Sequence, residues 1–388
     1  MVLTGLKIGK GQVSDSWVKL FTLINKCKYI LPALNSNKTM FRTYIPGFIL
    51  ATLFLLGVCS ISEAQSTFTN PLLPSGADPW SIYKDGYYYY TNTLGDRIAI
   101  WKTKDLSKLN TAVRKTVWMP PSGTMYSKQI WAPEIHFIDD KWYLYFAADD
   151  GKNENHRMYA LENRSADPLN GEWVFKGKVS DSTDKWAIDG SVFEHRDQLY
   201  MVWSGWEGDA NGRQDIFIAR MKNPWTIEGD RVKISEPTYD WEKHGDLNDP
   251  NNPPHVNVNE GPQMLKHGDK IFLIYSASGC WTDFYALGML TASEKSDLLD
   301  PASWKKSPES VFSQSPENGV YAPGHNSFFK SPDGSEDWIL YHANSQPGQG
   351  CGKHRSPRAQ KFTWKEDGTP DFGVPVREGE ILPAPSEK

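Results

Sequence analysis

Three kinds of feature are scarce in this chain of 388 residues: cysteines, long apolar runs and clusters of positive charge. It has only four cysteines, and their spacing does not give the closely paired Cys or His ligands of a zinc site. Its longest predominantly apolar run, residues 47–58, is too short to cross a membrane core of about 30 Å as a helix. No block of Lys and Arg could neutralise a phosphate backbone, so we expect no nucleic-acid partner.

Aromatic side chains, in contrast, are plentiful: the chain has 16 Trp, 17 Tyr and 17 Phe. Its hydrophobic content of 39% and its net charge of -5 are ordinary for a globular protein. A disordered chain would have fewer apolar residues and a stronger charge imbalance. The composition therefore excludes the disordered, collagen-like and multispanning membrane classes.

The N-terminal part of the chain differs from the rest in charge. Residues 1–64 hold seven of the 42 basic and two of the 47 acidic residues, a balance of +5 against -10 for residues 65–388. Arg42, the apolar run and the small residues around Ala64 follow the order of a secretory signal peptide. We therefore predict an N-terminal extension and signal peptide over residues 1–64, with Met40 as a possible true start. A buried core helix is the alternative.

The predicted mature chain, residues 65–388, would be secreted or periplasmic and free of the membrane once the signal peptide is removed. It contains two of the cysteines, Cys280 and Cys351. Cysteines in exported proteins can form disulfides, but pairing requires Cα atoms within about 7 Å. The sequence leaves open whether these two are bonded.

One pattern occurs five times in residues 65–388. Each copy has a polar residue, a short apolar segment, a turn and an aromatic or aliphatic strand, followed by a third apolar stretch. The polar residues that begin the copies are Asp78, Glu134, Asp189, Glu260 and His325. Four strands per copy and radial closure predict an all-β fold, a five-bladed β-propeller. A jelly roll or two separate sandwiches is the alternative, although neither requires five similar hairpins.

The first strand of each propeller blade lines the central channel, so the five polar residues should converge at one mouth of it. Four carboxyl groups and an imidazole placed together are costly, because like charges repel and raise each other's pKa. Two functions use such a cluster: a cation site with carboxylate ligands and acid–base catalysis. Aromatic neighbours such as Trp80 and Trp131 suit the stacking of a sugar ring. Because glycoside hydrolysis needs two carboxyl groups, the pattern favours a glycosidase.

A set of short motifs, spread from Phe68 to the C-terminus, resembles glycoside hydrolase family 43. Each motif is weak alone, but the set is specific. The motifs are Ala77-Asp78-Pro79-Trp80, Trp131-Ala132-Pro133-Glu134, Ile188-Asp189-Gly190-Ser191, Asn259-Glu260-Gly261-Pro262, Gly324-His325-Asn326-Ser327 and Arg358-Ala359-Gln360. The resemblance implies a five-bladed propeller that hydrolyses α-L-arabinofuranosides or β-D-xylosides with inversion.

The resemblance also implies roles for individual residues. Asp78 would be the general base, Glu260 the general acid, and Asp189 the residue that orients Glu260 and modulates its pKa. Arg358 would bind sugar hydroxyls near Asp189. His325 would lie on the propeller axis, where members of the family often hold a calcium or other ion; no organic cofactor is expected.

Two further residues are expected to contact substrate: Trp131 as a platform for a sugar ring, and Glu134 as a residue of the rim. Each assignment has an ordinary structural alternative. An Asp before Pro caps turns, as at Asp78, a lone histidine is usually a core residue, and Trp131 could simply pack in the core. Only the shared repeat position raises these residues above such alternatives.

We expect an exo-α-L-arabinofuranosidase that acts, as a monomer, on plant cell-wall oligosaccharides or polysaccharides such as arabinan. A β-D-xylosidase and an endo-arabinanase are the alternatives within the family. A non-catalytic carbohydrate-binding propeller is the alternative of another class, although a binder has no need of three converging carboxyl groups. The loops at residues 205–213 and 241–255 should shape the rim and decide between a closed pocket and an open groove.

Overall fold

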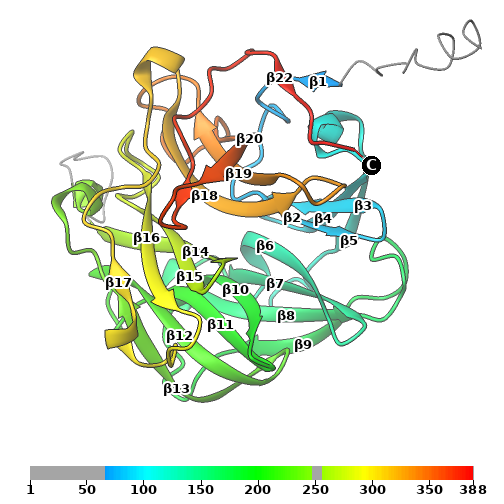
Figure 1. Ribbon diagram of the computed structural model, residues 1–388. Helices are drawn as coiled ribbons and strands as arrows, with labels where there is room; N and C mark the ends of the chain where they lie inside the picture. Colours follow the sequence, from blue (N-terminus) through cyan, green and yellow to red (C-terminus); the bar gives the residue numbers. More distant parts are fainter. Residues whose placement is uncertain (1–65, 247–255, 388) are drawn as a thin grey trace, which may run out of the picture. The chain divides into compact units, whose positions relative to one another are not determined.

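Five blades, each of four antiparallel strands, make up most of the described chain, and the predicted all-β, five-bladed β-propeller is confirmed (Figure 1). The computed structural model describes residues 66–246 and 256–387. The predicted signal peptide and the possible start at Met40 lie outside the described residues. No helix within the described ranges is long and apolar enough to span a membrane.

The strands of each blade follow one another in the sequence. Blade 1 consists of β2 (Trp80–Lys84), β3 (Tyr87–Thr91), β4 (Ile98–Thr103) and β5 (Val113–Trp118). Blade 2 consists of β6 (Lys128–Ile138), β7 (Lys141–Asp149), β8 (Arg157–Asn163) and β9 (Val174–Val179). Blade 3 consists of β10 (Ala187–His195), β11 (Gln198–Gly205), β12 (Arg213–Asn223) and β13 (Thr226–Ser235).

The last two blades have short outer strands. Blade 4 consists of β14 (Asn257–His267), β15 (Lys270–Ala277), β16 (Ala286–Ser293) and β17 (Lys305–Lys306). Blade 5 consists of β18 (Tyr321–Lys330), β19 (Asp337–Asn344), β20 (Ser356–Trp364) and β21 (Pro370–Asp371). Blades 3 and 4 are joined into one eight-stranded sheet, because β12 and β14 pair in parallel at Arg213–Asn257 and Gln214–Val258.

The hydrophobic core is divided among the five seams between neighbouring blades. Successive side chains of a strand point to opposite faces, so the second strand of each blade supplies both of its seams. In β3, Tyr88 and Tyr90 pack against blade 5, whereas Tyr89 packs against Trp142 of blade 2. This two-sided burial explains why the second strands are nearly continuous runs of aromatic and aliphatic residues.

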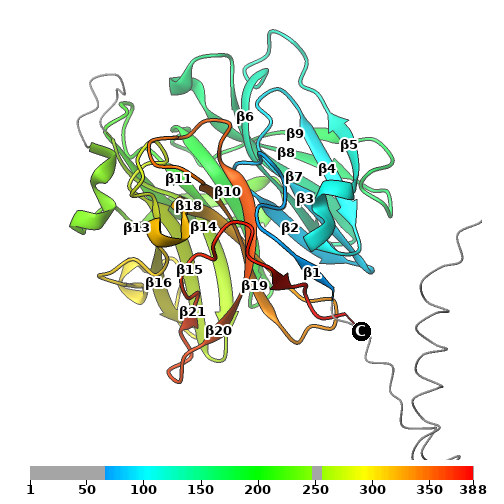
Figure 2. The same ribbon diagram turned by 90° about the horizontal axis from the view of Figure 1, so that it is seen from above.

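The two ends of the described chain meet and close the ring. β1 (Thr67–Phe68) pairs with β22 (Leu382–Pro383) in an antiparallel ladder, visible beside the C-terminus in Figure 2. Asn70 follows β1, and its buried side chain donates to and accepts from the backbone of Ala359 in blade 5, both at 2.9 Å. Blade 5 is thereby tied to the segment that leads into blade 1.

The inner strands are irregular where the sequence motifs lie. Asp78, Asp189 and His325 have φ values of 58°, 56° and 47°, and Gly261 has 56°. The ladders of β10 and β14 shift register between Ile188 and Ser191 and between Glu260 and Gln263. Such bulges bend a strand and re-aim its side chains. They turn the residues at the start of the inner strands toward the mouth of the channel.

Candidate active site

A cavity of about 570 Å³ lies at this mouth, and every blade contributes to its lining. The lining includes the three carboxyl groups of Asp78, Asp189 and Glu260. It also includes Trp131, Trp186, Trp281, Arg355 and the two cysteines Cys280 and Cys351. Asp78, Asp189 and Glu260 are 9%, 5% and 8% exposed, so the cavity brings three nearly buried carboxyl groups together.

Asp78 is surrounded by groups that favour its charged form. Arg355 Nη1 lies 3.1 Å from Oδ1, and the Thr93 hydroxyl donates to Oδ2 at 2.6 Å. His325 Nδ1 lies 3.3 Å from Oδ1. Burial alone would raise the pKa of Asp78, but the Arg355 guanidinium, the neighbouring imidazoles and Thr93 together hold that pKa well below its usual range. Asp78 is therefore an ionised carboxylate over the whole ordinary pH range.

Glu260 has the opposite environment. Burial raises the pKa of Glu260 to about 7; the charge of Asp78 adds to this rise, and the hydroxyl of Tyr285, which donates to Oε1 at 2.8 Å, opposes it. Burial and the neighbouring charges of Glu260 and Asp78 also raise the pKa of Asp189. Asp189 Oδ2 accepts the Gly261 N–H at 3.1 Å, which fixes it beside the strand that carries Glu260. The Asp189–Glu260 pair thus holds a proton at a pH where Asp78 has none.

Aromatic rings form the walls of the cavity. Trp131 stacks on the His156 ring, with centroids 4.0 Å apart, and His156 Nδ1 is held 3.0 Å from Asp149 Oδ2. Trp186 stacks on Trp206 with a centroid distance of 4.8 Å. Because each indole is held by stacking on a second ring, Trp131 and Trp186 offer fixed apolar faces toward the cavity. Such faces suit the C–H face of a sugar ring.

Two predicted residues lie behind the cavity rather than along it. Glu134 is buried and is hydrogen-bonded to the side chains of His136 and Gln263, and it is absent from the cavity lining. His325 contacts Asp78 and packs its ring against Gly261, where an added Cβ would lie 3.2 Å from Cγ. Burial lowers the pKa of His325, so its ring is neutral near pH 7. Neither side chain lies at the cavity surface.

The side chains around His325 decide whether the predicted axial ion has ligands. Calcium prefers six to eight oxygen ligands, whereas His325 presents one imidazole nitrogen to Asp78 and Asp189. Within residues 66–246 and 256–387, no group of three or more His, Cys, Asp and Glu side chains is arranged to hold a metal. The described residues therefore do not form a fitting calcium site.

The arginine that reaches the cavity differs from the predicted one. Arg358 is completely buried in β20, where Nη2 donates to Ser345 Oγ at 2.9 Å and to Glu378 Oε2 at 3.0 Å, and it does not line the cavity. Its predicted contact with sugar hydroxyls near Asp189 has no counterpart in this placement. Arg355, three residues earlier, lines the cavity and contacts Asp78.

Several other residues of the site were not singled out from the sequence. Thr93, Tyr285, Trp186 and Trp281 all lie outside the five repeat starts. Trp281 follows Cys280 directly, and Cys280 is bonded to Cys351, with Cα atoms 5.0 Å apart. The disulfide, left open by the sequence, is therefore formed at the wall of the cavity.

Of the two predicted rim loops, the first places Asn211 at the cavity. The second is described only up to residue 246, and Val256 follows it at the cavity wall. Residues 247–255 lie outside the described residues.

Comparison with known proteins gives consistent matches. A sequence model of glycosyl hydrolases family 43 matches residues 68–370. An extracellular exo-α-(1→5)-L-arabinofuranosidase from Streptomyces avermitilis is 42% identical over 346 residues, which cover 85% of this chain and 69% of that protein. An enzyme of the same description from Streptomyces chartreusis is 39% identical over 74% of this chain and 85% of its own length.

Among solved structures, the α-L-arabinofuranosidase from Lactobacillus brevis matches with a TM-score of 0.74 and 39% identity. The match covers 81% of this chain and 98% of that one.

Proposed function

Because the chain belongs to glycosyl hydrolases family 43, we propose that it is an inverting exo-α-L-arabinofuranosidase. Its substrate would be arabinan or another arabinose-substituted plant polysaccharide, from which it releases arabinofuranose. The relatives named above support the sugar and the exo mode. One observation carries the catalytic assignment: a single cavity holds one carboxyl group, Asp78, whose contacts with Arg355 and Thr93 keep its pKa low, and another, Glu260, whose pKa burial raises to about 7.

The mechanism follows from these opposite charge states. Asp78, kept ionised by Arg355, accepts a proton from a water molecule as that water attacks the anomeric carbon. Glu260, kept protonated by burial, donates its proton to the departing glycosidic oxygen. Asp189 orients Glu260 through the Gly261 backbone, and burial and the charge of Glu260 raise the pKa of Asp189 in turn. After one turnover Asp78 has gained a proton and Glu260 has lost one, so proton exchange with bulk water restores both groups.

The walls of the cavity support recognition of a sugar ring. Trp131 and Trp186 are fixed apolar faces, and Gln129, Asn153 and Gln214 bring amide groups to the same lining. Amide and carboxyl groups can donate to and accept from sugar hydroxyls. A β-D-xylosidase or an endo-arabinanase remains the alternative within the family. A non-catalytic sugar-binding propeller would not need the opposite pKa shifts of Asp78 and Glu260.

Export is part of the proposal. We propose a secreted or periplasmic enzyme, acting as a monomer on plant cell-wall carbohydrate. The Cys280–Cys351 disulfide supports an oxidising compartment, because cytosolic thiols stay reduced. The Streptomyces relatives are described as extracellular. The role of Arg358 in binding sugar hydroxyls stays a prediction from family resemblance, and neither Arg358 nor an axial ion carries a step of this mechanism.

The substrate is tested with a pair of aryl glycosides. Purified protein is incubated with 4-nitrophenyl α-L-arabinofuranoside and with 4-nitrophenyl β-D-xyloside, and release of the phenol is followed. We expect faster release from the arabinoside, and proton NMR should show the β-anomer of arabinose forming first. Preference for the xyloside would favour a xylosidase, and first appearance of the α-anomer would contradict inversion. Sugar binding without any release would favour the non-catalytic alternative.

The role of Glu260 is tested with Glu260→Gln, which preserves shape but cannot donate a proton as an acid. We expect hydrolysis of arabinan to fall by a factor of roughly 10² to 10⁴. The loss on 4-nitrophenyl arabinoside should be much smaller, because that leaving group needs little protonation. Glu309→Gln, at an exposed position, is the control and should change neither rate. Equal losses on the two substrates would rule out Glu260 as the acid.

A further inference from the structure

We propose that the Cys280–Cys351 disulfide is a positioning device for catalysis, which holds the loop of residues 345–355 so that Arg355 stays in contact with Asp78. The proposal rests on the proposed function, in which Asp78 is the general base. Arg355 is then a positioning residue for the base, and the two cysteines act on the reaction through Arg355.

The disulfide joins two loops that both end at the cavity. One loop, residues 278–285, connects β15 to β16 in blade 4 and carries Cys280 and Trp281. The other, residues 345–355, connects β19 to β20 in blade 5 and carries Cys351 and Arg355. All four of these side chains line the cavity. A bond between the loops therefore crosses from blade 4 to blade 5 at the catalytic mouth.

The blade 5 loop has no apolar anchor of its own. Its sequence, Ser-Gln-Pro-Gly-Gln-Gly-Cys-Gly-Lys-His-Arg, contains three glycines and no large apolar side chain that could anchor it by burial. Gly348 and Gly350 have φ values of 72° and 60°, which glycine adopts freely in the unfolded chain as well. Fixing such a segment costs conformational entropy, and a covalent link reduces that cost.

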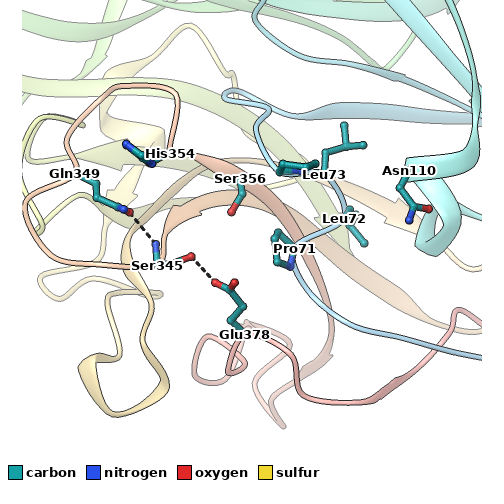
Figure 3. A pocket seen from close by; sticks show the side chains of 10 residues that line it. Pro71, Leu72, Leu73, Asn110, Ser345, Gln349, His354, Ser356 and Glu378 are labelled. Carbon is teal, nitrogen blue, oxygen red and sulfur yellow. Dashed lines mark hydrogen bonds between the residues drawn. The ribbon is translucent and has the colours of Figure 1, made fainter.

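The base of this loop is anchored by a small polar cluster. Ser345 donates to Glu378, Arg358 donates to both, and the Ser345 N–H is bonded to Gln349 Oε1 at 3.2 Å. Figure 3 shows Ser345, Gln349, His354 and Glu378 among the residues that line a second cavity. The buried Arg358 is thus explained as a support for the start of the loop.

The tip of the loop is tied to blade 4. The carboxylate of Asp283 accepts the Gly348 N–H at 2.8 and 3.0 Å, and the disulfide lies three residues further on. Beyond the disulfide, the backbone oxygen of Arg355 accepts the Gly76 N–H at 2.9 Å. Between the tip of the loop and Arg355, the disulfide at Cys351 is therefore the covalent restraint that holds the loop to blade 4.

The guanidinium of Arg355 depends on that restraint. Its Nη1 contacts Asp78 at 3.1 Å, whereas its buried Nε has no hydrogen-bond partner. With so few contacts, its position is determined mainly by the backbone that carries it. A displacement of about 1 Å at a catalytic group can cost roughly 100-fold in rate. Release of the loop should therefore reduce turnover without unfolding the propeller.

The experiment compares the oxidised protein with Cys280→Ser/Cys351→Ser. We expect kcat/KM on 4-nitrophenyl arabinoside to fall roughly 10- to 100-fold at a temperature far below the unfolding transition. Leu298→Ala, in the core between blades 3 and 4, is the matched control for stability. It should lower Tm but leave kcat/KM within a factor of about two, because it is remote from the cavity lining. An unchanged kcat/KM in the double serine variant would overturn the proposal.

A thermodynamic cycle separates positioning of Arg355 from a general loosening of the site. Arg355→Met is measured alone and together with the two serine substitutions. If the disulfide acts through Arg355, breaking it should cost little in the Arg355→Met background. Full additivity of the two losses would contradict this route.

Two further measurements distinguish failure of this inference from failure of the proposed function. Hydrogen exchange of residues 345–355 should accelerate in the double serine variant, and unchanged exchange would refute the restraint even if the wild-type protein hydrolysed neither glycoside. Dithiothreitol gives a reversible version: it supplies two electrons and two protons, leaves as its cyclic disulfide and yields two cysteine thiols. Wild-type activity should fall to that of the serine variant and return on reoxidation, whereas the serine variant should not respond.

Discussion

At the scale of single residues, three carboxyl groups of nearly equal burial differ in protonation because their neighbours differ. Arg355 and Thr93 stabilise the charge on Asp78, whereas Glu260 and Asp189 lie in the field of other carboxylates. Environment, rather than residue type, therefore separates the base from the acid. Residue type alone would give all of them similar pKa values near 4.

Tyr285 gives a pH prediction. Its hydroxyl donates to Glu260 and favours the carboxylate, so it holds the pKa of Glu260 lower than burial alone would. Tyr285→Phe should therefore raise the pKa of Glu260 above about 7. The acid then stays protonated to higher pH, and the alkaline limb of the kcat/KM profile should move upward.

The matched control is Tyr341→Phe, because the Tyr341 hydroxyl donates to Gln360 within blade 5 and not to the cavity. Its alkaline limb should coincide with that of the wild type. A downward shift in Tyr285→Phe would contradict the assignment of Glu260 as the acid.

The sequence predicted which carboxyl groups meet, but not all of their partners. Asp78, Asp189 and Glu260 occupy equivalent repeat positions, so their convergence follows from the fold. Arg355 lies in an irregular loop, where no periodicity distinguishes it from Arg358. Its signal, a charged residue between Cys351 and the third strand of blade 5, becomes meaningful only once the disulfide places that loop.

At the scale of elements, the inner strands combine regular pairing with a local bulge. The five hairpins could be read from the sequence because both faces of each second strand are buried, which produces continuous aromatic runs. The bulges could not be read in the same way. Positive φ at Asp78 and Asp189 depends on tertiary contacts, since aspartate adopts this region without requiring it.

Gly324 of β18 tests the packing behind the acid. A Cβ at this position would lie 2.3 Å from Cε1 of Tyr285, whose ring is buried and cannot swing aside freely. Gly324→Ala should lower the free energy of unfolding by about 1 to 3 kcal/mol. It should also reduce kcat/KM, because the displaced ring carries the hydroxyl bonded to Glu260.

Gly208→Ala is the control for this substitution, since no atom lies within 4 Å of the added Cβ. Urea unfolding and steady-state kinetics should leave it within error of the wild type. Wild-type stability and activity in Gly324→Ala would show that the Tyr285 ring is free to move.

At the scale of the whole molecule, the ring is held together by five packed seams and by pairing of its ends. Blade 5 must recognise a segment almost 300 residues away in the chain, and Asn70 provides part of that recognition through Ala359. The closure could not be predicted from the sequence, because β1 and β22 are only two residues long and carry no pattern.

Removal of the Asn70 side chain tests this closure. Asn70→Ala leaves the N–H and the C=O of Ala359 without these partners, at an expected cost of about 1 to 3 kcal/mol for each group. The free energy of unfolding in urea is the measurement, and Asn110→Ala, at an exposed site in the 3-10 helix Leu106–Thr111, is the control. A loss below about 0.5 kcal/mol would show that the ring closes without this contact.

The parallel pairing of β12 with β14 constrains the distance between Asp189 and Glu260 more than the distance of either from Asp78. Asp189 and Glu260 belong to one continuous hydrogen-bonded sheet, whereas Asp78 precedes a separate sheet and meets them only across packed side chains. The distance between the acid and its modulator is therefore fixed by backbone hydrogen bonds within that sheet. The distance between acid and base, which separates inverting from retaining hydrolysis, depends on seam residues that substitution can change one at a time.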